Sequence, residues 1–129
     1  MESVTPNIFV KDIHETIAFY KQLDFELIAS VPEEGDYVWA MMMAGKATFM
    51  FQSFESLGEE IPSISREKGG SLLFYIKMAG LRAFFTKIKD QVEVVKGLET
   101  TFYGATEFSI LDNNGFVLTF AEEEEKKPT

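Results

Sequence analysis

A repeat in the order of predicted elements constrains the fold more than any other feature of this sequence. Each half of the 129-residue chain reads as a β-strand, an amphipathic helix and three more β-strands. In the first half the strands are predicted at 4–10, 25–31, 37–43 and 47–52, with the helix starting at the N-cap Asp12. In the second half they are predicted at 71–76, 92–96, 103–111 and 116–121, with Leu81, Phe84, Phe85 and Ile88 on one helix face. We therefore interpret the chain as two βαβββ modules, which places it in the α+β class.

Residues 53–70 separate the two modules. They contain Gly58, Pro62 and four Ser and show no sustained period of 2 or 3.6, which predicts a crossover loop. We expect modules at about 4–52 and 71–122, this linker, and an acidic tail at 123–129, all within one domain spanning 1–129. Asn114-Gly115 between the last two strands predicts a tight hairpin, because both residues tolerate positive φ.

The charge and composition exclude several classes of function. With 12 Lys and Arg against 21 Asp and Glu, the formal charge is −9, so neither nucleic acid nor an anionic membrane is expected as a partner. No apolar run is long enough to span a membrane and the start lacks a signal sequence, so we expect a complete, cytoplasmic protein. The absence of Cys excludes disulfides and thiolate sites, and His14 is the single His available to a metal or a catalytic triad. At the predicted start of a helix, His14 is expected to be an ordinary surface residue.

Several segments carry a resemblance to a known family. They include Thr5-Pro6-Asn7-Ile8-Phe9-Val10-Lys11-Asp12-Ile13 with Ile17-Ala18-Phe19-Tyr20 and Leu23-Asp24-Phe25, then Tyr103-Gly104, and Glu107 to Glu122 with its Asp-Asn-Asn-Gly turn. Together they cover essentially Val4 to Glu122 and resemble the vicinal oxygen chelate superfamily, also called the glyoxalase, bleomycin resistance and extradiol dioxygenase superfamily. The Tyr103-Gly104 pair and the acidic ending are most similar to the metal-free bleomycin-resistance branch.

This resemblance implies an open, cup-shaped mixed sheet with helices on its convex face and a small-molecule ligand on its concave face. It also implies a homodimer. Strand alternation then sorts the side chains, with Phe49, Phe51, Phe74, Phe108 and Phe120 facing the helices. The ligand-binding candidates are Trp39, Met41, Met50, Gln52, Ser71, Tyr75, Tyr103, Glu107 and Thr119.

Metal-dependent members of the superfamily carry His or Glu at four concave positions. Here the matching residues are Thr5, Met50 or Gln52, Ser71 and Thr119, none of which is a His or a carboxylate. A divalent first-row ion needs several good N or O donors, so neither a metal nor another cofactor is expected.

The sequence is compatible with two functions. The first is a metal-independent binding protein that sequesters a cationic or amphipathic compound by aromatic stacking and acidic attraction. The second is a glyoxalase-like lyase, isomerase or dioxygenase-type enzyme acting on a small carbonyl or oxygenated substrate. In the enzyme hypothesis Glu107 is the candidate catalytic residue, because a carboxylate on a concave face can act as a general base. The run Glu122 to Glu125 is expected to be a solvated tail with no role in the site.

Overall fold

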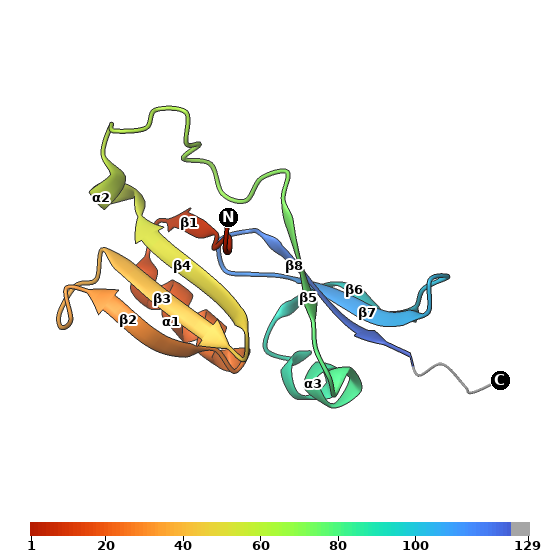
Figure 1. Cartoon of the computed structure of the whole chain (residues 1–129). Coiled ribbons are helices and arrows are strands. Elements are labelled where there is room, and N and C mark those ends of the chain that lie inside the picture. Colours follow the sequence, from red (N-terminus) through yellow and green to blue (C-terminus); the bar gives the residue numbers. More distant parts are fainter. Residues whose placement is uncertain (125–129) are drawn as a thin grey trace. The chain divides into compact units, whose positions relative to one another are not determined.

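A computed structural model describes residues 1–124 of the chain (Figure 1). The chain divides into two compact units, the first covering Met1–Glu67 and the second starting at Lys68. Each unit contains one of the expected modules, and each is described by itself below. Of the predicted acidic tail, residues 125–129 lie outside the described residues.

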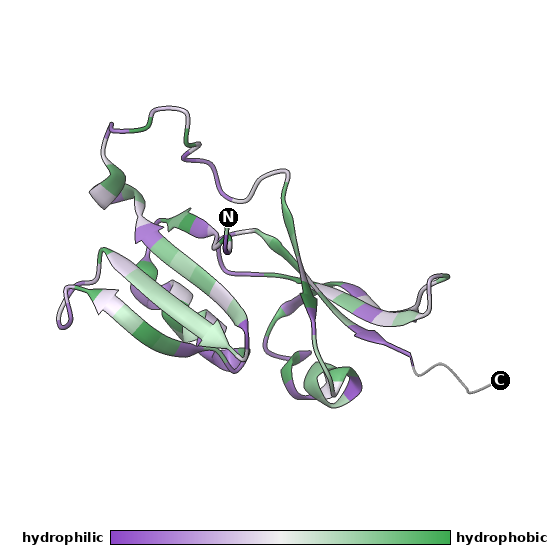
Figure 2. Cartoon of the chain, viewed as in Figure 1, coloured by the Kyte–Doolittle hydropathy of each residue, from purple (hydrophilic) through white to green (hydrophobic). Residues whose placement is uncertain are grey.

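The first module forms an open four-stranded mixed sheet in the order β1-β4-β3-β2. Its elements are β1 (Asn7–Val10), α1 (Ile13–Gln22), β2 (Glu26–Val31), β3 (Trp39–Ala44), β4 (Ala47–Ser53) and the short α2 (Phe54–Leu57). β1 runs parallel to β4, whereas β2, β3 and β4 pair antiparallel. β3 is hydrophobic along most of its length (Figure 2).

Helix α1 covers one face of this sheet. It begins as predicted, with the side chain of Asp12 accepting a 3.0 Å hydrogen bond from the backbone N–H of Glu15. The fully buried ring of Tyr20 packs against Phe25, Phe49 and Phe51, with centroids 5.4, 5.6 and 4.9 Å away. Burying this aromatic cluster supplies the main apolar contact between the helix and the sheet.

The second module repeats this arrangement with the sheet order β5-β8-β7-β6. Its elements are β5 (Leu73–Lys77), α3 (Leu81–Ile88), β6 (Glu93–Thr100), β7 (Ala105–Leu111) and β8 (Val117–Glu123). β5 is parallel to β8, and β6, β7 and β8 are antiparallel. Phe84 of α3 packs on Phe108 and Phe120 at centroid distances of 6.2 and 5.1 Å, so one face of this sheet is closed by the helix. The predicted α+β fold class, with two βαβββ modules, is confirmed.

Several boundaries differ from the sequence predictions. The linker begins with α2, because Ser53 caps it by accepting a 3.1 Å hydrogen bond from the N–H of Ser56. β5 starts at Leu73, so Ser71 lies in a bend before the strand. β6 extends to Thr100, beyond the predicted end at Lys96, and β7 starts at Ala105, which leaves Tyr103 in the turn between them.

The turn before β8 is also longer than the predicted tight hairpin. The backbone N–H of Asp112 donates to the carbonyl of Phe116 at 2.8 Å, so the loop has three residues between them. Gly115 has a φ of +83°, whereas Asn114 has no positive φ. The Asp112 carboxylate accepts from the N–H groups of Asn114 and Phe116, which organises the turn without a second left-handed residue.

Candidate ligand-binding site

The face of the second sheet opposite α3 presents the predicted candidates of this module. Strand pairing aligns Tyr75 with Thr119 and Thr119 with Ser109 across β5, β8 and β7. The neighbouring row aligns Lys77, Ala121 and Glu107. Because side chains on paired positions point to the same face, these residues form one continuous surface, as the alternation predicts.

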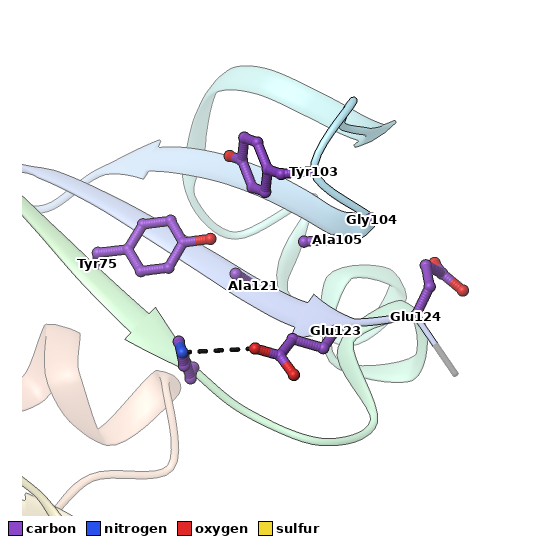
Figure 3. A pocket seen from close by; sticks show the side chains of 8 residues that line it. Tyr75, Tyr103, Gly104, Ala105, Ala121, Glu123 and Glu124 are labelled. Carbon is purple, nitrogen blue, oxygen red and sulfur yellow. Dashed lines mark ion pairs between the residues drawn. The ribbon is translucent and has the colours of Figure 1, made fainter. Parts of the chain in front are cut away.

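Tyr75, Glu107 and Tyr103 form a hydrogen-bonded cluster on this face. The hydroxyl groups of both tyrosines donate to the same carboxylate oxygen, Oε2 of Glu107. Tyr75 comes from β5 and Tyr103 from the turn before β7, and their hydroxyl ends converge (Figure 3). The carboxylate is therefore held by two neutral donors with aromatic rings beside it.

The cluster changes the acidity of both phenols. The hydrogen bond to Glu107 is the main cause that raises the pKa of Tyr75 well above its ordinary value, and desolvation and the negative charge of Glu107 add to it. The pKa of Tyr103 is also raised, and its hydrogen bond to Glu107 is again the main cause. Both phenols thus stay protonated, and remain hydrogen-bond donors, throughout the neutral range.

The lysines near this cluster are engaged elsewhere. Lys77 pairs with Glu123 at 3.6 Å, and Lys96 pairs with Glu99 at 2.7 Å. The hydrogen bond to Glu99 raises the pKa of Lys96. Within residues 1–124, Glu107 has no ion-pair partner. The charge of Glu107 adds to the raised pKa of Lys96, and both side chains line one cavity, so this lysine lies within electrostatic reach of the carboxylate. The Glu107 carboxylate is therefore a negative charge beside two aromatic rings that no cation of residues 1–124 contacts directly.

A buried hydroxyl pair lies on the same face, in the row of Tyr75 and one row away from Glu107. Ser109 Oγ and Thr119 Oγ1 are 2.8 Å apart, and both residues are buried. Thr119 is one of the predicted ligand-binding residues, and Ser109 is not among them. One of the two hydroxyl groups donates its proton to the other oxygen, so the hydrogen bond between them uses one of the two hydroxyl protons.

Two cavities adjoin the tyrosines. The smaller, of about 330 Å³, is lined by Leu73, Tyr75, Lys96, Tyr103, Glu107, Phe108, Ser109 and Thr119. The larger, of about 800 Å³, is lined by Tyr75, Lys77, Tyr103, Gly104, Ala105, Ala121, Glu123 and Glu124 (Figure 3). Because both cavities share Tyr75 and Tyr103, this pair stands at the boundary between them. A small organic molecule fits spaces of this size.

The remaining candidates lie in the first module. Trp39 is paired with Gln52 and Met41 with Met50, so these four side chains share the sheet face opposite α1 and are half-buried, as predicted. Asn7 Nδ2 donates a 3.0 Å hydrogen bond to Gln52 Oε1 on that face. Ser71, by contrast, is exposed in the bend before β5 and lines neither cavity of the second module.

Two acidic residues that were assigned to a solvated tail belong to the folded sheet. Glu122 and Glu123 lie on β8, and the carboxylate of Glu122 accepts hydrogen bonds from the backbone N–H groups of Gly80 and Leu81. Glu123 lines the larger cavity and pairs with Lys77. The prediction of a solvated tail is therefore wrong for these two residues, because strand pairing with β7 continues to Glu123. It is also wrong for Glu124, whose carboxylate accepts a hydrogen bond from Thr106, pairs with Arg82 at 3.4 Å and lines the larger cavity.

The match to known proteins agrees with this architecture. The family model of the Glyoxalase/Bleomycin resistance protein/Dioxygenase superfamily matches residues 3–120. The chain belongs to this superfamily. A comparison with curated proteins gives no match.

Solved structures of superfamily proteins and others resemble the chain over nearly its whole length. A protein of unknown function from Agrobacterium tumefaciens str. C58 has a TM-score of 0.78 at 27% identity, covering 95% of this chain and 94% of that chain. A bleomycin-binding protein complexed with bleomycin has a TM-score of 0.66 at 19% identity, covering 96% and 100%. A glyoxalase/bleomycin resistance protein/dioxygenase family enzyme from Burkholderia phytofirmans PsJN has a TM-score of 0.75 at 21% identity, covering 92% and 96%. At these identities the last two show a shared fold.

The residues at the superfamily's metal positions do not fit a first-row metal ion. They supply the hydroxyls of Thr5, Ser71 and Thr119 with the thioether of Met50 or the amide of Gln52, which are weak ligands for such an ion. The Thr119 side chain is hydrogen-bonded to Ser109, and the Gln52 amide is hydrogen-bonded to Asn7 and Ser56. Among residues 1–124, no group of three His, Asp or Glu side chains could hold a metal ion.

Sequence reasoning did not select several residues that the structure adds to the site. Ser109, Lys96 and Leu73 line the smaller cavity, and Glu123 lines the larger one. Ser109 and Leu73 alternate with residues of the helix-facing side, so the period-2 pattern could have selected them. Lys96 could not be found this way, because the register of β6 against β7 shifts around it.

Within the described part of the chain, no helix has the length and hydrophobicity needed to cross a membrane.

Proposed function

We propose that this protein is a metal-independent small-molecule-binding protein that sequesters a cationic or amphipathic compound on the open face of its second sheet. The observation that carries the proposal is the Glu107 carboxylate, held by two tyrosines and without an ion-pair partner within residues 1–124. A bound cation would give this carboxylate a direct ion-pair partner, which Lys96, paired with Glu99, does not provide.

Aromatic contacts support the same ligand class. A cation close to the Glu107 carboxylate also lies close to the rings of Tyr75 and Tyr103, whose π-faces attract positive charge. The wall of the smaller cavity includes the apolar side chain of Leu73 and the ring of Tyr75, which suits a ligand with a hydrophobic part. The formal charge of −9 adds long-range attraction for a cationic compound.

Bleomycin is the natural first probe, because a structural relative is a bleomycin-binding protein complexed with bleomycin. On this proposal the protein acts by sequestration and contributes to resistance against a toxic compound. We further propose that it works as a homodimer in the cytoplasm.

The test is calorimetric titration of the intact protein with bleomycin and with a panel of cationic antibiotics. We expect saturable binding by at least one compound, and a loss of affinity in Glu107→Gln of at least tenfold. Glu26→Gln, at an exposed position on β2, changes the net charge equally and is the matched control. Equal affinity in wild type and Glu107→Gln would contradict the assigned site.

The alternative function is an enzyme acting on a small carbonyl or oxygenated substrate, with Glu107 as base. The direct contact of a carboxylate with two phenols favours it, since it joins a proton acceptor and proton donors in one cluster. The raised pKa of both tyrosines makes them poor acids at neutral pH, which favours binding over catalysis. An enzyme would lose turnover in Glu107→Gln and keep most of its substrate affinity.

A further inference from the structure

The Ser109–Thr119 pair has one hydroxyl proton to spare. Each hydroxyl carries one proton, and a hydrogen bond between the two uses only one of them. Ser109 Oγ and Thr119 Oγ1 contact each other at 2.8 Å, and neither oxygen has another hydrogen-bond partner within residues 1–124. Both residues line the smaller cavity. The wall of this cavity therefore contains a hydrogen-bond donor that has no acceptor in the described part of the chain.

This donor and the Glu107 carboxylate lie in the same cavity at a defined spacing. Glu107 and Ser109 are two positions apart on β7 and point to the same face. A strand rises about 3.4 Å per residue, so their Cα atoms are separated by about 7 Å. The side chains of Leu73 and Tyr75 also line this cavity and give it apolar surface beside the carboxylate and the hydroxyl pair.

We infer that the ligand of this site is an organic cation that also carries a carbonyl, ether or hydroxyl oxygen, separated from its charged nitrogen by a short apolar segment. The nitrogen pairs with Glu107, and the oxygen accepts the spare proton of the Ser109–Thr119 pair. The segment between them is apolar and lies along Tyr75. This inference rests on the proposed function, since it takes the cation at Glu107 as given and adds the second recognition point.

A pair of matched probes tests the second point separately from the first. The probes are 3-(aminomethyl)benzamide, which carries an amide oxygen, and 3-methylbenzylamine, which has the same ring and ammonium group but no oxygen. Binding to the full chain is measured by two-dimensional NMR titration. We expect the amide probe to bind about three- to tenfold more tightly, which is the range of one additional neutral hydrogen bond.

Variants that lack the Ser109 and Thr119 hydroxyls test whether this pair causes the tighter binding of the amide probe. In the double variant Ser109→Ala with Thr119→Val, both hydroxyls are lost with little change of volume, so the two probes should bind equally. Each single variant keeps one hydroxyl and should keep the preference for the amide probe. Ser65→Ala with Thr86→Val removes two exposed hydroxyls elsewhere and is the matched control.

The outcomes separate the two proposals. If both probes bind equally to the wild type and both weaken in Glu107→Gln, the carboxylate site stands and the second recognition point is wrong. If neither probe, nor any of the antibiotics, binds the wild type, the proposed function itself is wrong. A preference that persists in a folded double variant also overturns the inference. Should the double variant fail to fold, the wild-type comparison and the single variants still decide, because loss of the preference in either single variant contradicts a shared spare proton.

Discussion

Glu122 of β8 accepts a 2.9 Å hydrogen bond from the backbone N–H of Gly80, which is the N-cap residue of α3. Gly80 has no side chain that could cap the helix, and the first turn of α3 contains no acidic residue. The second carboxylate oxygen of Glu122 accepts from the N–H of Leu81 at 3.2 Å. A strand 42 residues away thus supplies both the acceptor and the negative charge that this helix start needs.

Removing this carboxylate should weaken the second module. We expect Glu122→Ala to lower the free energy of unfolding by about 1 kcal/mol, the usual effect of losing a helix cap. Glu123→Ala is the control, since the Glu123 carboxylate forms only an exposed ion pair with Lys77, and a change below about 0.5 kcal/mol is expected. Urea denaturation followed by circular dichroism measures both. Equal losses would show that the capping contact does not stabilise α3.

The phenol cluster predicts a change of stability at high pH. Folding raises the pKa of Tyr75 and Tyr103 above the value of about 10 expected in the unfolded chain, so the folded state holds these protons more tightly. The stabilisation is complete below about pH 10 and is lost as the pH rises from there through the folded pKa. Phenolate absorbance should show a late ionisation that Tyr75→Phe removes and Glu107→Gln moves toward the ordinary value. An unchanged titration in Glu107→Gln would contradict the cause assigned here.

Core and site aromatics should respond differently to truncation. Phe108 is fully buried against Phe84, Phe85 and Phe120, so Phe108→Ala should cost about 3–5 kcal/mol. Trp39→Ala should cost less, because this side chain is half-buried on the face of β3 opposite the core residues Ala40 and Met42. Chemical denaturation gives both values. A loss as large for Trp39→Ala as for Phe108→Ala would place Trp39 in the structural core.

Metal analysis tests whether the residues at the superfamily's metal positions bind a metal ion. The protein purified under mild conditions should carry no stoichiometric Zn, Ni, Fe or Mn, because hydroxyl, thioether and amide side chains stand at the superfamily's metal positions. Addition of these ions should leave the melting temperature unchanged. About one bound ion per chain would contradict metal independence and favour a metal-dependent enzyme.

The homodimer is tested by sedimentation. We expect a dimer at tens of micromolar, because β2 and β5 are edge strands that expose apolar side chains, including Ile28, Val31 and Leu73, and such edges favour a covering partner. Sedimentation equilibrium at several concentrations measures the association. A monomer throughout that range would contradict the expectation.

Local patterns in the sequence were sufficient for the order of the two βαβββ modules and for the faces of the regularly paired strands, but not for α2 or for β6, whose register shifts. Leu118 and Phe120 are buried against the helix side, and Tyr75 and Glu107 lie on the opposite face, because β5, β7 and β8 pair without a register shift and keep the period of two. The start of α1 was equally predictable, since Asp12 and Glu15 are close in the sequence. The boundaries near Ser71, Tyr103 and Ser53 were not, because turns and short capped helices depend on single hydrogen bonds.

The sequence by itself therefore determined two βαβββ modules, their apolar cores and a list of candidate side chains. Tertiary structure decided which candidates meet. Tyr75 reaches Glu107 from 32 residues away, Thr119 meets Ser109 through the register of β7 and β8, and Glu122 reaches the start of α3 from the far end of the module. The physical reason is that a side chain's face follows from the local backbone period, whereas its partner depends on strand register and on contacts between distant segments, which no local pattern encodes.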